Sequence, residues 1–460
     1  MSRPKPSGVE RFLCVFTEVR PGEGRTALML LGSVFLILCA YYLIKPAREG
    51  WLAVSVISGL SKIEVKAYSS FGQTILLIGA VAVFARLSNR WPRRKLVTHV
   101  GLFFAANLPF FWMLQPGLIA DTVPYAGLAF YLWVGVFNVF IVATFWAFAA
   151  DFYSEDRGRR LLPLVAVGAT AGAALGSWMS GFLSGLGGDT FDLLLLAIVP
   201  LTIAIALARR ADARGETVET PPEAPVPPGS ENGESAWGLI ARHPYLTTTA
   251  LLTVVLGWVA SNGDNILFGL VQESIAASAS AEEITDTSLL EKYTREQTTA
   301  FYGDLFMWVN LVALGSQAFL ASRLLKYGGF GVLVLFLPVL SVIAYSSMAI
   351  FPALAVIKVL KVAENSSNYS INNTARHVLW LPTTAEMKYK AKSAIDTICI
   401  RFGDGLAALT VLASIHVLSA SVIQLLWLNA ALATVWVVLA LVLAREHATV
   451  SSMGFDNRPA

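Results

Sequence analysis

The stretch ADARGETVETPPEAPVPPGSENGES, residues 211–235, divides the chain into two apolar parts. It contains five prolines among Glu, Gly and Ser residues, and such a segment cannot bury enough apolar surface to fold. We therefore predict a disordered linker over residues 209–243. On each side of it lie six runs of about 20 apolar residues, the length that an α-helix needs to cross a bilayer.

These twelve runs predict an all-α integral membrane protein. The predicted spans are 26–45, 66–86, 96–115, 124–149, 161–184 and 191–208, then 244–268, 300–322, 328–350, 352–375, 393–417 and 421–444. The expected parts are an N-terminal segment (1–25), two six-helix bundles (26–208 and 244–444) and a C-terminal tail (445–460). The stretch 271–299, which is acidic, is expected to carry a short helix over 289–296 outside the membrane.

The composition supports a membrane protein. Hydrophobic residues make up 55% of the chain and charged residues 14%, against about 25% charged in soluble domains. Twenty-five Lys and Arg residues lie in every second connection and five in the others, which places both termini in the cytoplasm. A net charge of +3, with no basic run interleaved with aromatic residues, predicts no nucleic-acid partner.

The two halves echo each other at an offset of 230 residues. Three pairs of polar residues match: Asn138 with Asn368, Asp156 with Glu386, and Arg160 with Lys390. Together with the 6+6 count, the matches favour a transporter built from two parallel repeats. We expect Asn138 and Asn368 to bind substrate. The residues expected in cytoplasmic loops or gates are Asp156, Arg160, Glu386, Lys390 and Asp396.

Several classes of chemistry are absent from the sequence. It contains no GxxxxGK[ST], HExxH, GxSxG or CxxC motif, and its five His residues are far apart. We therefore expect no enzyme activity, no metal site and no cofactor. Any active transport must be secondary, driven by a gradient or by exchange.

The tenth predicted span contains a polar stripe. At 100° per residue, six side chains fall within an arc of about 80°: Lys358, Lys361, Asn365, Asn368, Asn372 and Arg376. Charged side chains inside a membrane normally face a bundle interior or an aqueous cavity, so the stripe favours a substrate-binding surface. The alternative is that the lysines pair with Glu364 or Asp404 for packing alone.

Three other polar groups lie within predicted spans. In the eleventh span Arg401 and Asp404 are three residues apart, close enough for an ion pair that is either structural or gating, and Asp396 lies nearby. Ser261–Asn265, with Asp264 in its centre, indicates either a broken helix or a helix end. Lys45, Arg48 and Glu49 surround a proline and form either an interfacial cluster or an anion-attracting mouth.

The fifth span contains a GxxxGxxxG pattern formed by Gly168, Gly172 and Gly176. Small residues at this spacing let two helix backbones approach closely inside a membrane. We interpret the pattern as close helix packing and not as a binding loop.

Four segments resemble the ATP/ADP translocase family, the nucleotide exchangers of intracellular bacteria and plastids. They are YYLIKPARE (41–49), FWAFAADFYSEDRGRRLLPLVAVGATAGAALGS (145–177), FYGDLFMWVNLVALGSQAFLASRLLKYGGF (301–330) and NYSINNTARHVLWLPTTAEMKYKAKSAIDTICIRFGDG (368–405). The resemblance implies a major-facilitator-like fold in a bacterial inner membrane. It also implies antiport of a small anion, ATP or ADP in the family, with basic residues binding phosphate.

The resemblance carries over to particular residues. Lys45, Arg48 and Glu49 match the family's basic–acidic cluster after the first span. A second matching segment contains Lys390, Lys392, Asp396 and Arg401. The ATP/ADP exchangers carry Lys near the position of Asp404, and a carboxylate there weakens the binding of a polyphosphate.

The leading hypothesis is therefore a nucleotide antiporter that acts as a monomer in the lipid bilayer. The alternatives are a major-facilitator permease or exporter for another anion or a lipid-like amphiphile, and a membrane scaffold or sensor without transport. A scaffold has no need of a polar stripe through a bilayer, which counts against the last alternative.

Overall fold

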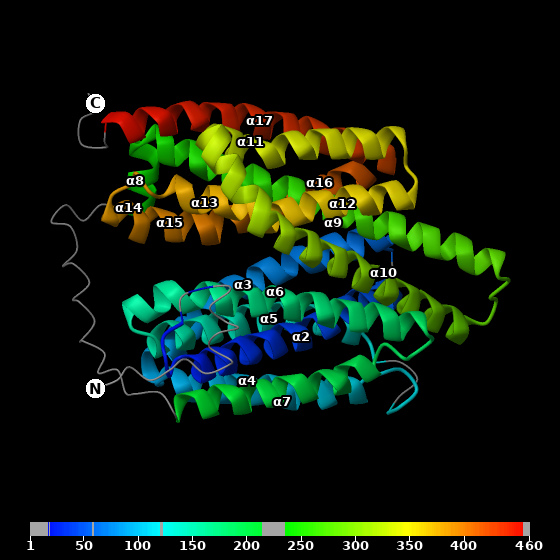
Figure 1. Ribbon diagram of the computed structural model, residues 1–460. Helices are drawn as coiled ribbons and strands as arrows, with labels where there is room; N and C mark the ends of the chain where they lie inside the picture. The colour runs from blue at the N-terminus through cyan, green and yellow to red at the C-terminus, as the bar shows by residue number, and fades with distance from the viewer. Residues whose placement is uncertain (1–16, 18, 58, 120–122, 214–234, 454–460) are drawn as a thin grey trace. The chain divides into compact units, whose positions relative to one another are not determined.

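The computed structural model describes residues 17, 19–57, 59–119, 123–213 and 235–453 (Figure 1). Within these residues every secondary-structure element is a helix. The chain forms two compact units, each of which takes residues from both sides of the linker. Unit 1 contains Met1–Val56, Ile75–Pro222 and Ser278–Leu311, and unit 2 contains Ile57–Thr74, Glu223–Ala277 and Val312–Ala460. The division into bundles at 26–208 and 244–444 stays a prediction.

Unit 1 is formed by long helices. They are α2 (Gly24–Val54), α4 (Arg93–Met113), α5 (Ala126–Phe152), α6 (Glu155–Gly185) and α7 (Asp192–Asp212), with most of α3 (Lys62–Arg90) and α10 (Thr287–Gly315). Trp51 near the end of α2 is 4% exposed and is held by three aromatic rings. Its ring centroid lies 4.7 Å from Phe191, 5.1 Å from Phe130 and 6.4 Å from Phe111. This packing fixes the end of α2.

Unit 2 consists of long helices and shorter helical pieces. They are α8 (Ala236–Arg242), α9 (Pro244–Ala281), η1 (Ser316–Leu320), α11 (Ala321–Ile350), α12 (Leu354–Ser367), η2 (Asn368–Asn372), α13 (Asn373–Leu379), α14 (Ala385–Tyr389), α15 (Ala391–Ala394), η3 (Ile395–Cys399), α16 (Ile400–His416) and α17 (Val422–Met453). The η elements are π-helical. Ala67 of α3 packs against Ala408 and Val411 of α16 in a small apolar cluster.

The described helices confirm a multi-pass membrane protein. Ten of them are long and apolar enough to cross a bilayer. One of the ten, Thr287–Ile350, covers the predicted spans 300–322 and 328–350 together. The predicted span 352–375 corresponds to α12, η2 and α13, and Lys358, Lys361 and Glu364 make this segment less apolar than the others.

The glycine pattern of α6 produces the close packing that the sequence predicts. Gly168, Gly172 and Gly176 lie against the backbone of α2 at Leu31, Phe35 and Cys39, and a Cβ at Gly172 would overlap the Phe35 carbonyl oxygen. Because the contacts advance by four residues on both helices, α2 and α6 run parallel. A similar contact in unit 2 places Gly403 of α16 against the backbone of α9 at Val254 and Trp258.

Two predictions of local structure are wrong. Ser261–Asn265 neither breaks nor ends a helix, because α9 continues without interruption from Pro244 to Ala281. The expected separate helix at 289–296 is the beginning of the long helix α10. In both places polar side chains find hydrogen-bond or ion-pair partners while the backbone stays helical.

The predicted linker lies largely outside the described residues, since residues 214–234 are among those not described. On its two sides α7 continues to Asp212 and α8 covers Ala236–Arg242. The N-terminal segment is described only at Thr17 and from Val19 onward, and α17 continues into the predicted tail as far as Met453.

Candidate functional site

A cluster of cations and aromatic rings lies in unit 1 where α2 contains Pro46. Lys45 and Arg48 are each 9% exposed and Glu49 is 1% exposed. The Lys45 ammonium lies 3.8 Å from the ring centroid of Phe306 and 4.8 Å from that of Tyr42. The Arg48 guanidinium lies 4.4 Å from the Tyr131 ring centroid. An aromatic face attracts a cation, so these rings favour positive charge at both side chains.

Arg48 also forms an ion pair with its neighbour in sequence. Its Nε and Nη2 donate to Glu49 Oε1 at 3.1 and 2.5 Å. Both side chains are at least nine-tenths buried, so they do not extend to water as a snorkelling pair does. A buried, charged guanidinium can bind a phosphate with two parallel hydrogen bonds. The cluster therefore has the chemistry of an anion site.

A second charged cluster lies in unit 2, around Lys361 of α12. Its ammonium lies 2.7 Å from Glu364 Oε2 and 3.1 Å from Asp264 Oδ1. The Tyr345 hydroxyl donates to Glu364 at 2.8 Å. Lys361 is 1% exposed, whereas the Asp264 side chain is 55% exposed. The lysine therefore has the carboxylate partner that the packing interpretation of the stripe requires, and a second one from α9.

The Asp404 carboxylate also has several partners within unit 2. It accepts hydrogen bonds from Arg401 Nη1 at 3.1 Å, from Thr74 at 3.3 Å and from Ser261. Ser261 and Asp264 lie one turn apart on α9. The predicted polar segment of α9 therefore contributes to both acidic clusters of unit 2 as part of an intact helix.

The helical spacing of the polar stripe changes at η2. A π-helical turn holds more residues than an α-helical one, so the 100° spacing ends at Asn368. Lys358 and Asn365 are half-buried, and Asn372 is buried and donates to Asn368 at 2.8 Å. Arg376 forms an ion pair of 2.6 Å with Asp396. Four members of the stripe therefore have side-chain partners: Lys361, Asn368, Asn372 and Arg376. The π-helical turn itself is of a kind that is frequent at functional sites.

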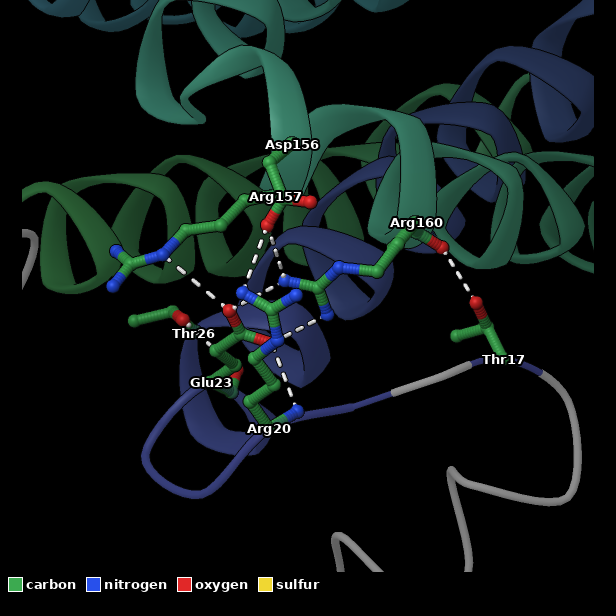
Figure 2. A network of polar contacts seen from close by, with 7 residues as sticks. All are labelled: Thr17, Arg20, Glu23, Thr26, Asp156, Arg157 and Arg160. Carbon is green, nitrogen blue, oxygen red and sulfur yellow. Dashed lines mark hydrogen bonds and ion pairs between the residues drawn. The ribbon is translucent and has the colours of Figure 1, made fainter.

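The structure contains a polar network where α6 begins (Figure 2). Arg160 donates to both oxygens of Glu23 at 3.0 Å and to Asp156 at 3.2 Å. Arg20 donates to Asp156 at 3.0 Å, and the Thr17 hydroxyl donates to the Arg160 carbonyl at 2.7 Å. The network ties the segment before α2 to the first turns of α6.

The predicted repeat reappears in local geometry. Asp156 and Arg160 pair at 3.2 Å, and their matches Glu386 and Lys390 pair at 2.9 Å. The N-cap residues Ser154 and Thr384 are also 230 positions apart, and both have extended backbone with ψ of 160° and 162°. The two segments therefore enter a helix with the same backbone conformation, although only the Thr384 side chain accepts a capping hydrogen bond. Asn138, the remaining residue of the matched set, is half-buried in α5.

Glu23 makes this network sensitive to pH. Burial alone would raise the pKa of Glu23, but hydrogen bonds from Arg160 and Arg20 and the charges of Arg160 and Arg157 outweigh it and lower the pKa. A carboxylate with a lowered folded-state pKa stabilises the protein above its ordinary pKa near 4.5. That contribution is lost as the pH falls through the lowered value.

We expect Glu23→Gln to reduce the free energy of unfolding at pH 7 by about 1 kcal/mol, because the arginines lose a charged acceptor. The difference from the wild type should begin to shrink as the pH falls below 4.5, the ordinary pKa, and should disappear below the lowered pKa of the folded protein. Thermal unfolding of both proteins from pH 7 down to pH 3 measures this. A difference that stays constant over that range would contradict the ion-pair explanation.

Several partners in these clusters are not evident from the sequence. Tyr131, Phe306 and Tyr345 look like ordinary apolar residues of a span, and nothing in their spacing links them to a cation. Glu64 is 2% exposed and pairs with His416 at 2.6 Å, a contact across 352 positions. Glu364, by contrast, carries a sequence signal, because it lies one turn after Lys361.

Comparison with known proteins identifies a family that the chain resembles. Residues 301–447 match the family TLC ATP/ADP transporter. ADP,ATP carrier protein 1 of Chlamydia pneumoniae is 23% identical over 335 residues, which cover 64% of this chain and 61% of that protein. The chain therefore spans less than two thirds of the carrier's length. The predicted resemblance to the ATP/ADP translocase family is confirmed.

Solved structures show the fold. The nucleoside transporter NupG aligns with a TM-score of 0.61 at 12% identity, over 91% of this chain and 98% of its own. An autoinhibited peptide transporter of the POT family aligns with a TM-score of 0.61 at 13% identity, over 95% and 99%. A D-xylose–proton symporter gives 0.59 at 13%, over 90% and 96%. The predicted major-facilitator-like fold is confirmed.

Proposed function

We propose that this protein is a secondary transporter that exchanges nucleotides or related organic phosphates across a membrane. The observation that carries the proposal is the buried cluster of Lys45 and Arg48 against aromatic rings. Lys45, Arg48 and Glu49 come from the segment YYLIKPARE, which resembles the ATP/ADP translocases. The family match in the second half of the chain supports the same substrate class.

Arg48 is the residue that we expect to bind phosphate. Its ion pair with Glu49 fixes the orientation of the guanidinium. An incoming phosphate would compete with that carboxylate for the same N–H groups. Such competition returns the cluster to a closed ion pair after the substrate leaves. A reversible exchange of this kind suits an antiporter and needs no cofactor.

The proposal is tested by nucleotide exchange in proteoliposomes that contain only this protein. Uptake of labelled ADP should depend on unlabelled nucleotide inside the vesicles. Arg48→Gln/Glu49→Gln removes the guanidinium without leaving a buried carboxylate unpaired, and it should raise KM roughly 10- to 100-fold. Arg86→Gln, which removes an exposed arginine of α3, should leave exchange unchanged. If ATP, ADP and nucleoside monophosphates are all not exchanged, the nucleotide proposal is wrong.

A second candidate is a proton-coupled permease for another anion. The observation in its favour is the unit 2 cluster, in which Glu364 and the half-exposed Asp264 share the ammonium of Lys361. The cluster contains two carboxylates and one cation. The carboxylate that the cation does not balance could carry a transported proton. In the same vesicles an inward proton gradient should then drive uptake, and Asp264→Asn should abolish that dependence. Exchange at a rate that does not depend on the proton gradient would favour the antiporter hypothesis.

We also place the protein in a bacterial inner membrane with both termini in the cytoplasm, because of the distribution of Lys and Arg. With Cys14, Cys39 and Cys399 replaced, an impermeant maleimide should label Ser278→Cys, in the exposed last turn of α9, in intact cells. Ser451→Cys, at the end of α17, should be labelled only after the cells are broken. Labelling of Ser451→Cys in intact cells would show that the proposed orientation is wrong.

A further inference from the structure

A cavity of about 460 Å³ lies in unit 1 where α4 begins, α5 ends and α7 ends. Its polar lining comes from Lys95, Thr98 and His99 of α4 and from Arg209 and Asp212 of α7, and Phe148 of α5 adds an apolar wall. The volume is within the usual range for sites that hold small molecules, about 300–1,000 Å³. None of these residues belongs to the charged clusters described above.

The lining attracts anions. Lys95 and Arg209 come from different helices, and within the described residues neither forms an ion pair. Asp212 is the carboxylate of the lining, so two cations outweigh one anion. The His99 ring lies 2.6 Å from the Lys95 carbonyl through Nδ1 and 5.2 Å from the Trp91 ring centroid. The first turn of α4 adds the positive end of the helix dipole.

The cavity continues into a surface suited to lipid chains. On α4 the exposed side chains recur every three or four residues from the cavity onward: Lys95, His99, Leu102, Phe103, Ala106 and Phe110. On α7 they recur in the same way away from Arg209: Ala206, Ile203, Thr202 and Val199. Leu102, Phe103 and Ile203 are 47–59% exposed, and large apolar side chains exposed on a membrane helix face hydrocarbon.

The level of the cavity in the membrane follows from the helix ends. α4 begins at Arg93 and α7 ends at Asp212, so the apolar surfaces of both helices stop at the cavity, where the basic residues begin. A glycerophospholipid has the same order of parts, with acyl chains below a phosphate at the headgroup level. Basic pockets between membrane helices are known to bind anionic headgroups.

We propose that this cavity binds the headgroup of an anionic glycerophospholipid. The phosphate lies between Lys95 and Arg209, and the acyl chains follow the exposed apolar side chains of α4 and α7. The site is separate from the cluster of Lys45 and Arg48, so a lipid here does not compete with a transported anion there. It makes the stability of the protein depend on the charge of the surrounding lipid.

The test is thermal unfolding of the detergent-purified protein with added lipid. Phosphatidylglycerol should raise the melting temperature by about 3 °C more than phosphatidylcholine does, since it binds only the folded protein. Lys95→Gln/Arg209→Gln should lose this difference. Arg90→Gln/Arg210→Gln removes the same charge from exposed arginines outside the cavity and should keep it. Native mass spectrometry of the wild type should show one phosphatidylglycerol retained in preference to phosphatidylcholine.

Three results would overturn the proposal. The first is an equal loss in both double variants, which would indicate general surface charge. The second is an equal effect of the two lipids on the melting temperature of the wild type, with no selective retention in the mass spectrum. This result is decisive even if Lys95→Gln/Arg209→Gln fails to fold. The third is an equal shift with glycerol 1-phosphate at the same concentration, which would assign the cavity to a free organic phosphate.

Discussion

Lys361→Met is expected to lower the free energy of unfolding by about 3–5 kcal/mol, the range for removing one partner of a buried ion pair. The Glu364 side chain is 5% exposed and depends on the Lys361 ammonium at 2.7 Å. Without it the carboxylate keeps only hydroxyl donors, Tyr345 at 2.8 Å and Ser341 at 3.3 Å. Asp264 is half-exposed and can be solvated instead. Thermal and denaturant unfolding in detergent measure the loss.

Two further variants identify its cause. Lys358→Met removes the same charge one turn earlier on α12, where the side chain is only half-buried, and should cost much less. Lys361→Met/Glu364→Leu removes both charges and should recover most of the stability, as replacement of buried pairs by apolar residues often does. If Lys361→Met unfolds like the wild type but loses substrate affinity, Lys361 contacts substrate and the packing interpretation of the stripe is wrong.

The sequence predicts the helices and the fold well because membrane helices are governed by a strong, local signal. Runs of about 20 apolar residues can be recognised one at a time, without knowing what packs against them. The one weak run, at Leu354–Leu379, is also the one that contains Lys358, Lys361 and Glu364. Its charges lower the apolar signal where the structure buries Lys361, so the exception coincides with a candidate site.

The candidate sites are only half predictable, and the reason is distance along the chain. Single-helix patterns identify Lys45, Arg48 and Lys361 as unusual, because a charge inside an apolar run is expensive. Their partners lie far away: Phe306 is 261 positions from Lys45. No periodicity within a helix reports such contacts. The same limit explains the wrong prediction at Ser261–Asn265, whose polar side chains meet Asp404 and Asn429 from an intact helix.

Close helix packing shows the same contrast between local and distant signals. The three glycines of α6 are spaced four residues apart, so one sequence window predicts the contact with α2. In unit 2, a Cβ at Gly257 of α9 would lie 2.7 Å from the Ile400 carbonyl oxygen, but Gly257 and Gly403 are 146 positions apart. Neither helix repeats glycine every four residues, so no pattern in the sequence predicts this contact.

Among glycine-to-alanine substitutions in the first half of the chain, Gly172→Ala should lower the stability of the protein the most. The added Cβ would overlap the carbonyl oxygen of Phe35, which belongs to helix backbone and cannot move aside as a flexible side chain can. The helices α2 and α6 must therefore separate, and we expect a loss of about 3 kcal/mol, the upper end of the range for overpacking. Thermal unfolding in detergent and the yield of folded protein measure the effect.

Gly79→Ala is the matched control. Gly79 lies in the middle of α3, and apart from the adjoining backbone of α3 itself no atom lies within 4 Å of the position that a Cβ would take. There the same change should stabilise the helix by up to about 1 kcal/mol, because alanine favours helix and glycine does not. The two substitutions therefore have opposite signs although the chemistry is identical. If Gly172→Ala is as harmless as Gly79→Ala, the backbones of α2 and α6 are not in contact at Phe35.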